Sequence, residues 1–470
     1  MKINALLEEL IAVAKKPKTD FALSMNMTPS GLSKILGGSR VPSMRERKTF
    51  TSQAAEYFAE AIYSSHCHIK LTDIFPVIYD FESREELQTF LSSAIAYALD
   101  DAFTEEASLN LSHAERGMYY LGRRPVINQL CILLSDLMAS CPDEPLEVFA
   151  ALPLSDPAYS KLLRKLVLSD CGKESSTALH YFFGDGLLDA ESGMGAEDLL
   201  LFISRIQRRF DLTFHRLGRD IGPFLLFKGK ILLLFNTQID GTPLLVPIYH
   251  KSFLNIFYGN LIKKGGEEIS LDTAGAAAYL EKNPRFIPRL LDRGIDSVYN
   301  FMSIGYLLKK EELAAAGGSP AVCAAMSELF GHILSAKTDF VVSVAAMDRF
   351  SSLGKAIVPL IGAVPFPPQL RADYLQRFNA YLSDSRCGMV KIVDSGLANL
   401  AVLCSGELCL VYTLDDTFSR ERIHIFRSAR LAGLLHSELG GAVITDFSMD
   451  LWNAYQEGLA DIHPGPGAAT

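Results

Sequence analysis

The stretch Pro17–Ser43 constrains the fold of this 470-residue chain more than any other segment. Apolar residues recur with helical spacing in Thr19–Met25 and again in Ser30–Leu36, and the four residues Asn26-Met27-Thr28-Pro29 separate the two runs. Asn is one of the few residues other than glycine that tolerate the left-handed backbone of a sharp reversal between helices. The pattern therefore predicts two short helices joined by a tight turn, a helix-turn-helix.

The residues on either side of the second helix support this interpretation. Thr28 can cap the helix, and Pro29 suits its first position, where no amide hydrogen is needed. Met27 would fill the space under the turn. Gly38 can end the helix in a left-handed conformation, and Pro42 stops the chain from continuing it. Start, turn and stop thus indicate the same local structure.

The segment resembles the Cro/CI-like, or XRE-type, helix-turn-helix family over roughly 25 of the 470 residues. In that family a small alanine packs where the helices touch, here Ala22, and the turn glycine of many members is Asn26 here. The run Ser33–Pro42 is similar to the family's end of the recognition helix. Leu36 replaces a common acidic residue, and Lys18 replaces a common glutamine. The resemblance implies an all-helical domain that reads double-stranded DNA.

The distribution of charge is typical of a DNA-binding segment on an acidic protein. From Lys15 to Lys48 there are eight basic and two acidic residues, a balance of +6, whereas the whole chain carries −9. The rest of the chain therefore sums to −15. Helix pairs of this shape also occur in proteins that never bind DNA, but a basic segment confined to the motif favours binding to phosphates.

Candidate contact residues follow from the position of each residue in the motif, because the first turns of a recognition helix face base edges. The candidates for base edges are Ser30, Gly31 and Lys34, and those for phosphates are Lys18, Thr28, Ser39 and Arg40.

The opening segment, residues 1–16, is better interpreted as the first helix of the DNA-binding domain than as a targeting signal. Glu8 and Glu9 interrupt its apolar run, whose spacing is helical. No stretch approaches about 18 uninterrupted apolar residues, so we expect a cytoplasmic protein that does not enter a membrane.

The fold class predicted for the chain is multidomain α+β: an N-terminal all-α helix-turn-helix domain followed by a large mixed α/β region. We predict four parts: a DNA-binding domain at 1–65, a mostly helical region at 66–209, an α+β region at 210–385, and a β unit with a C-terminal helix and a disordered tail at 386–470. Within them, residues 44–65 would complete the DNA-binding domain as helices. Segments near 274–280, 286–291 and 322–333 would be helical as well.

Two stretches of the large region have the same layout. Residues 224–235 form two apolar runs across the turn Lys228-Gly229, followed by a third run at 244–249 and a helical segment. Residues 401–412 repeat this across Ser405-Gly406, followed by a run at 422–426 and a helical segment. The pattern predicts a duplicated β-β-β-α unit. The alternative is two unrelated hairpins that look alike.

Signatures of catalysis and of metal binding are missing from the sequence. The eight cysteines contain no CxxC pair and are expected to be reduced core residues. His66-Cys67-His68 is a metal-ligand cluster in composition, but neighbouring side chains diverge, so no metal site is predicted. No phosphate-binding loop, nucleophile elbow or zinc-protease motif is present, and no cofactor is expected.

The function predicted from the sequence is a DNA-binding transcriptional regulator. One helix-turn-helix reads a half-site, so a homodimer is expected, and the C-terminal region would sense an unknown small-molecule or protein effector. Two alternatives remain open. The large region could bind a protein or peptide partner, or it could be an unrecognised enzyme tethered to DNA.

Overall fold

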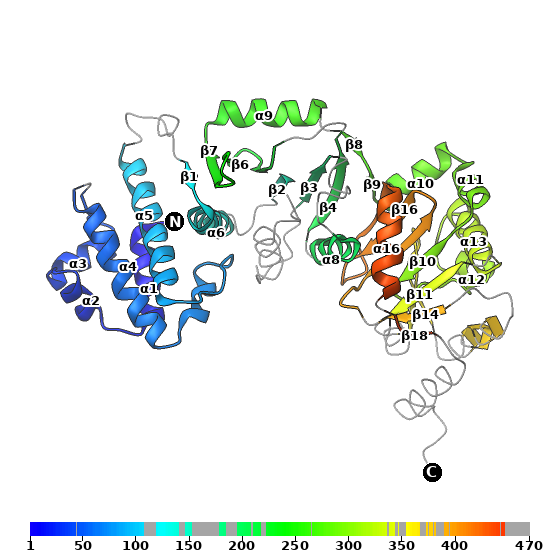
Figure 1. The fold of residues 1–470 in the computed structure, drawn as a ribbon, viewed down its shortest axis with the longest axis horizontal. Helices are drawn as coiled ribbons and strands as arrows, with labels where there is room; N and C mark the ends of the chain where they lie inside the picture. The colour runs from blue at the N-terminus through cyan, green and yellow to red at the C-terminus, as the bar shows by residue number, and fades with distance from the viewer. Residues whose placement is uncertain are drawn as a thin grey trace, which may run out of the picture. The chain divides into compact units, whose positions relative to one another are not determined.

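The structure is a computed structural model, shown in Figure 1. It describes a large part of the chain, namely residues 1–43, 45–107, 119–140, 146–152, 178–184, 195–207, 210–217, 222–264, 266–335, 338–343, 346, 354–366, 373, 374, 376–378, 380, 381, 390–393, 395–441 and 443–446. The expected C-terminal helix near 449–459, the expected disordered tail, and Cys141, Cys171 and Cys387 lie outside these residues.

The fold is multidomain α+β, as predicted. The chain divides into two compact units that are each discontinuous in sequence: unit 1 contains residues 1–178 and 221–265, and unit 2 contains residues 179–220 and 266–470. The boundaries of the four regions predicted from the sequence stay a prediction. The region 66–209, expected to be mostly helical, also contains three strands, β1, β2 and β3.

The elements of unit 1 begin with helices and continue with a sheet. They are α1 (Ile3–Ala14), α2 (Lys18–Ser24), α3 (Pro29–Leu36), α4 (Arg47–Ser64), η1 (His68–Asp73), α5 (Arg84–Ala107), β1 (Tyr120–Leu121), α6 (Arg123–Ser140), β2 (Glu147–Ala151), β5 (Phe224–Phe227), β6 (Ile231–Thr237), β7 (Pro243–Ile248) and α9 (Lys251–Lys264).

Unit 2 contains both strands and helices. They are β3 (Ala178–Phe183), which starts at the unit boundary, α8 (Ala196–Gln207), β4 (Asp211–Arg216), β8 (Glu267–Glu268), β9 (Ser270–Leu271), α10 (Thr273–Lys282), α11 (Phe286–Arg293), β10 (Ser297–Asn300), α12 (Lys310–Ala315), α13 (Pro320–Ser335), β11 (Asp339–Ser343), β12 (Lys355–Val358), β13 (Gly362–Pro365), β14 (Val390–Val393), β15 (Leu400–Ser405), β16 (Leu408–Leu414), β17 (Glu421–Arg427), α16 (Ala429–Gly441) and β18 (Val443–Asp446).

The N-terminal helices share an aromatic and aliphatic core. Phe21 of α2 is fully buried, and its ring centroid lies 4.6 Å from that of Phe58 and 5.2 Å from that of Tyr57, both on α4. Helix α4 also packs along α5, where Arg47 forms an ion pair with Asp100 at 2.5 Å. The helices expected in residues 44–65 are therefore confirmed as one long helix, α4, and α5 adds a further layer to this core.

Both predicted β-β-β-α stretches are confirmed, as β5-β6-β7-α9 and β15-β16-β17-α16. The turn glycines Gly229 and Gly406 both have a left-handed backbone, with φ of 71° and 57°. The first turn is longer than predicted, because Lys230 belongs to the loop: its N–H donates to the carbonyl of Phe227 at 3.0 Å. The second turn is Gly406-Glu407 and not the predicted Ser405-Gly406, because Ser405 ends β15 and pairs with Leu408. The two hairpins thus share their layout but not their turn length.

The structural repeat is larger than the sequence pattern indicated. In unit 1, five antiparallel strands are ordered β1-β7-β6-β5-β2, and in unit 2 five antiparallel strands are ordered β9-β17-β16-β15-β10. In unit 1, the two-residue strand β1 precedes α6 and then β2, and β1 pairs with β7, the last strand of its meander. In unit 2, the two-residue strand β9 precedes α10, α11 and then β10, and β9 pairs with β17, the last strand of its meander. A chance resemblance between two hairpins would not extend to β1 and β2 in one unit and to β9 and β10 in the other.

Strands β10, β11 and β14 are absent from the sequence prediction, which treated the region of β10 and β11 as helical and placed residues 390–393 of β14 in the β unit of residues 386–470. They are parallel to one another, and each is four or five residues long. Short apolar runs covered on both faces lack the alternation that identifies a half-exposed strand. The predicted helical segments are confirmed as α10 and α11, which precede β10, and as α13, which lies between β10 and β11.

No helix within the described ranges is both long and apolar enough to cross a membrane.

Candidate nucleic-acid interface

The predicted turn between α2 and α3 is present in the structure. Asn26 has a φ of 53°, the left-handed conformation expected of it. The hydroxyl of Thr28 accepts a hydrogen bond from the N–H of Gly31 at 3.1 Å, and Pro29 occupies the first position of α3. Met27 is half-buried, and its N–H donates to the carbonyl of Ala22 at 2.9 Å. Each turn residue thus has the local role that its chemistry predicted.

The end of α3 is closed by backbone hydrogen bonds around a left-handed glycine. Gly38 has a φ of 71°, its N–H donates to the carbonyl of Ile35, and that of Ser39 donates to Lys34, both at 3.0 Å. This pair of bonds is the Schellman motif. The hydroxyl of Ser39 also donates to the Lys34 carbonyl, at 3.1 Å. Ser39 therefore stabilises the helix end in addition to any contact with phosphate.

Helix α3 has one buried and one exposed face. Leu32, Ile35 and Leu36 are at most 6% exposed and pack against the rest of the helical core. Ser30, Ser33, Lys34 and the following Gly37 are exposed, and their spacing places them on one side of the helix. Ser33 was not among the sequence candidates, although the same helical spacing could have identified it. Leu36, where the resembled family often has an acid, is a core residue here.

Gly31 lies closer to the turn than to the exposed face. It is half-buried, and a Cβ added there would lie 3.2 Å from the Thr28 hydroxyl oxygen and 3.8 Å from the Met27 side chain. Its candidate role at base edges is thus combined with a packing role, because a larger residue would press on the cap.

The basic side chains of the motif differ in whether a carboxylate already pairs with them. Lys18 contacts Glu8 of α1 at 3.0 Å, and Arg40 contacts Glu46 at 3.6 Å. Among the described residues no acidic group forms an ion pair with Lys34. Lys34 is therefore the cation of the exposed α3 face that is available to a phosphate or base without first breaking an internal pair.

All seven sequence candidates lie in α2, in α3 or in the turns beside them, so the structure brings them together on one segment. Ala22, the helix-contact alanine, is fully buried, as is Phe21 beside it. The contact residues are thus held on and beside a short helix whose orientation is set by its packing against α1 and α2.

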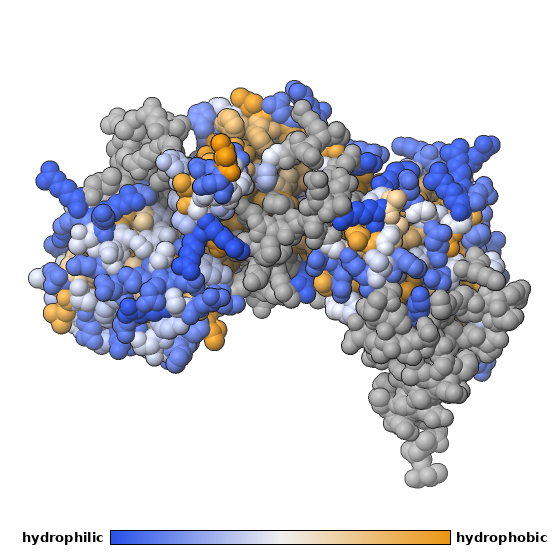
Figure 2. Space-filling view, viewed as in Figure 1, coloured by the Kyte–Doolittle hydropathy of each residue, from blue (hydrophilic) through white to orange (hydrophobic). Residues whose placement is uncertain are grey.

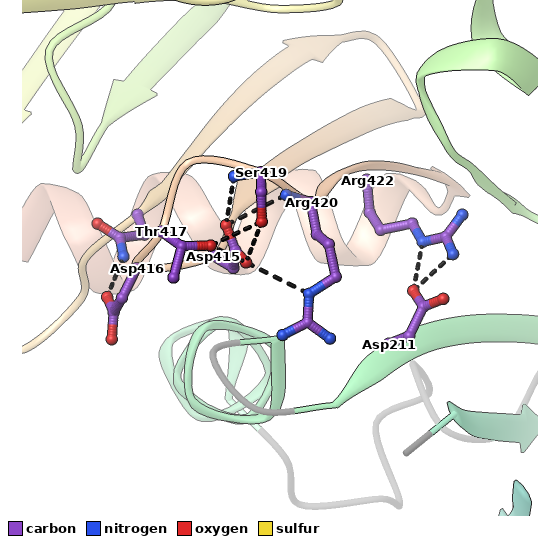
Figure 3. Close-up of polar contacts among 8 residues, drawn as sticks. Asp211, Asp415, Asp416, Thr417, Ser419, Arg420 and Arg422 are labelled. Atoms are coloured by element: carbon purple, nitrogen blue, oxygen red, sulfur yellow. Dashed lines mark hydrogen bonds and ion pairs between the residues drawn. The ribbon is translucent and has the colours of Figure 1, made fainter. Parts of the chain in front are cut away.

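A dense polar cluster outside the helix-turn-helix lies in unit 2, in the loop between β16 and β17 (Figure 3). The buried carboxylate of Asp415 accepts hydrogen bonds from the hydroxyl of Thr417 at 2.7 Å, from the N–H and hydroxyl of Ser419 at 2.8 and 3.0 Å, and from the N–H of Arg420 at 3.1 Å. Arg422 donates twice to Asp211, at 2.8 and 2.5 Å. Both oxygens of Asp415 are occupied, so this cluster holds the loop in place.

No arrangement of three or more histidine, cysteine or acidic side chains capable of holding a metal ion occurs in the described part of the chain. Cys131, Cys323, Cys404 and Cys409 are buried thiols that form no disulfide with one another, and Cys67 is a half-buried thiol.

The chain matches no model of a known protein family, and no curated protein sequence matches it. Among solved structures it is similar to TrmBL2, described as an archaeal chromatin protein whose structure shows a novel mode of DNA binding. That alignment has 12% sequence identity and a TM-score of 0.21, and it covers 43% of this chain and 66% of that one. The interface is therefore interpreted from its own geometry.

Proposed function

We propose that this protein is a DNA-binding transcriptional regulator of the XRE type, with α3 as its recognition helix. The observation that carries the proposal is the exposed face of α3, where Lys34 lies beside Ser30 and Ser33 without an internal ion pair among the described residues. Hydroxyl and ammonium groups in the first turns of such a helix can donate to base edges in the major groove. Lys18, Thr28, Ser39 and Arg40 flank that face as phosphate contacts.

The proposal includes a cytoplasmic homodimer. One recognition helix reads only a few base pairs, so specific binding requires a second copy about one DNA turn, roughly 34 Å, away. The remaining region would sense an effector that changes the separation of the two recognition helices. No catalytic role is proposed for any residue.

Helix α9 is the surface that best fits a second copy of this chain. Its side chains Phe253 and Ile256 are 43% and 63% exposed, and hydrophobic side chains gather over α9 in the space-filling view (Figure 2). Its counterpart in the structural repeat is α16, which packs against α8 in unit 2. Because the equivalent helix is covered by another helix, we propose that α9 is covered by the dimer partner.

Selection of bound sequences from a random duplex library would test the regulator function. The full-length protein should enrich one short motif, present as an inverted repeat. Lys34→Ala should abolish the enrichment and lower the affinity for the selected duplex, with a shallower dependence on salt because a cation is lost. Arg40→Ala should have a smaller effect, since Arg40 is already paired with Glu46 at 3.6 Å.

Lys282→Ala is the matched control, because Lys282 is an exposed lysine on α10 of unit 2. It should bind the selected duplex like the wild type. Failure of the wild type to enrich any motif would contradict the regulator function. Equal affinity and salt dependence in wild type and Lys34→Ala would contradict the assigned recognition face.

A further inference from the structure

Two cysteines of unit 2 lie opposite each other on neighbouring strands. Cys404 of β15 and Cys409 of β16 are direct cross-strand partners, and their sulfur atoms are 3.8 Å apart. The register that pairs them is set by the tight turn Gly406-Glu407, and the pair of Ser405 with Leu408 lies between this turn and the cysteines. The backbone of the hairpin therefore holds the two thiols next to each other.

The two cysteines occupy the kind of cross-strand position that a disulfide can bridge. The carbonyl of Cys404 accepts a hydrogen bond at 2.9 Å from the N–H of Asp296, beside β10, so it points away from β16. The Leu414 N–H donates to the Asn399 carbonyl at 3.0 Å, so the odd-numbered residues of β15 are those that hydrogen-bond with β16. Cys404 and Cys409 therefore form a non-hydrogen-bonded pair, in which the Cα atoms are about 4.5 Å apart. Disulfides span Cα separations of about 4.4 to 6.8 Å.

The two thiols differ in acidity. Hydrogen bonding from the Cys409 thiol lowers the pKa of Cys404; burial opposes this effect, and the Ser297 hydroxyl supports it. The hydrogen bond to Cys404, together with burial, raises the pKa of Cys409. The thiolate is the reactive form of cysteine, so Cys404 is the expected nucleophile and Cys409 the thiol that reacts second.

The burial of the pair restricts the oxidants that can reach it. Cys404 is 3% exposed and Cys409 is fully buried. The pair of Ser405 with Leu408 separates them from the exposed turn Gly406-Glu407. The end of a hairpin opens at a lower cost in free energy than the whole unit. A small oxidant of nearly the size of water, hydrogen peroxide, therefore suits this position better than a bulky disulfide.

We propose that Cys404 and Cys409 are a redox-sensitive dithiol that hydrogen peroxide oxidises to a reversible disulfide. The Cys404 thiolate attacks one peroxide oxygen and the O–O bond breaks, which gives a sulfenic acid on Cys404 and a hydroxide that takes up a proton to become water. The Cys409 thiol then attacks the Cys404 sulfur, and the sulfenic oxygen leaves as a second water. Two thiols and one peroxide thus give one disulfide and two waters, and exchange with an external dithiol reverses the reaction.

The disulfide would close the end of a hairpin that neighbouring loops already hold. The N–H of Gly406 donates to the Asp296 carboxylate at 2.6 Å, and the hydroxyl of Ser405 donates to the Gly294 carbonyl at 2.6 Å. The two strands need not separate or change register for the bond to form. This redox chemistry goes beyond the regulator function and can be measured without DNA.

Peptide mapping of the full-length protein tests the disulfide directly. Trypsin cuts after Lys391 and Arg420, so one peptide, residues 392–420, contains Cys404 and Cys409 and no other cysteine. The folded protein is treated with hydrogen peroxide, the peroxide is removed, and free thiols are alkylated in denaturant. The peptide should then be two hydrogens lighter and carry no alkyl group. Dithiothreitol added before alkylation should restore two alkylated thiols.

Cys323 is the internal reference, because it is a buried thiol of the same unit that lies in a separate peptide, residues 311–337. Its thiol donates to the carbonyl of Leu313 at 3.5 Å. It should stay available for alkylation at peroxide concentrations that oxidise the pair. Cys323→Ser is the matched control variant, and it should form the disulfide like the wild type.

Two further variants separate the roles of the thiols. Cys409→Ser should stop at the sulfenic acid of Cys404, which dimedone traps as a covalent adduct. Cys404→Ser should give roughly tenfold less adduct on Cys409, because the remaining thiol is less acidic. Mass spectrometry of the peptide of residues 392–420 measures both adducts.

Two alkylated thiols in this peptide after peroxide treatment of the folded wild type would overturn the proposal. A disulfide that forms only in denaturant, or oxidation of Cys323 at the same peroxide concentration, would also overturn it. Equal dimedone adducts in the two serine variants would overturn the assignment of Cys404 as the nucleophile. If a serine variant does not fold, the wild-type peptide still decides whether the disulfide forms.

Discussion

At the scale of single residues, the basic side chains of the helix-turn-helix differ in whether a carboxylate of the protein competes with DNA for them. Glu8 of α1 lies 3.0 Å from the ammonium of Lys18, so a phosphate must compete with a carboxylate for this lysine. Lys34 has no such competitor among the described residues. Affinity for DNA at this surface is therefore set by the acidic neighbours as well as by the basic residues themselves.

Removing the competing carboxylate should strengthen DNA binding. Glu8→Gln is expected to raise the affinity for a mixed-sequence duplex roughly two- to fivefold at low salt, because it frees Lys18 and removes a charge that repels phosphate. Glu9→Gln makes the same change in net charge at a position that does not contact Lys18. Fluorescence anisotropy should show the larger gain for Glu8→Gln, and equal gains would assign the effect to net charge alone.

Asp415 makes the stability of unit 2 depend on pH. Burial raises the pKa of this carboxyl, but the hydrogen bonds from Thr417, Arg420 and Ser419 together outweigh burial and lower it below its ordinary value. The carboxylate thus stabilises the folded state above about pH 3.9, its ordinary pKa, and this contribution is lost as the pH falls through the lower folded value.

Asp415→Asn should lower the free energy of unfolding by about 2 kcal/mol at pH 7, because an amide cannot accept all of these hydrogen bonds. The deficit should shrink as the pH is lowered below about 4, where the wild type loses the same charge. Denaturant unfolding at several pH values measures both effects. Asp416→Asn, a change at the exposed neighbour, should cost less, and a deficit independent of pH would argue against the ionised carboxylate as the cause.

At the scale of elements, α3 depends on its two ends because it is only eight residues long. Isolated helices of this length are unstable in water, so packing and capping must hold it. Its buried residues, its Thr28 cap and its Gly38 termination are all visible in the sequence, since each is a local effect. The same reasoning failed for β10 and β11, whose partners are distant in sequence.

The cap can be tested without altering the recognition face. Thr28→Ala should reduce the free energy of unfolding by about 1 kcal/mol, whereas Thr28→Ser should retain most of it, because serine keeps the oxygen that accepts the Gly31 N–H. Thermal unfolding of the two variants measures the difference. Equal losses would indicate that the methyl group, and not the hydroxyl, provides the stabilisation.

At the scale of the whole molecule, the structural repeat suggests how two copies would meet. The counterpart helices α9 and α16 differ in their surroundings, because α16 is covered by α8 and α9 exposes Phe253 and Ile256. Exposed apolar side chains on one helix are a common feature of protein interfaces.

Ile256→Lys is expected to convert a dimer to a monomer at micromolar concentration, because it places a charge in the apolar contact. Binding to an inverted repeat should then fall to the level of a single half-site. Light scattering coupled to gel filtration, together with binding to both duplexes, measures this. Lys251→Ala, an exposed change on the same helix, should leave the mass unchanged. A monomeric wild type would refute the dimer, and a dimeric Ile256→Lys would exclude α9 as its interface.

The sequence by itself determined the helix-turn-helix, its caps, its core residues and the two β-β-β-α stretches. These features depend on backbone preferences and on hydrophobic periodicity, and both are properties of short stretches of sequence. The tertiary structure alone decided that Glu8 pairs with Lys18, that β1 and β9 extend the repeat, and that Arg422 of β17 pairs with Asp211 of β4. Such contacts join residues that are far apart along the chain, and no local preference specifies which distant side chains come together.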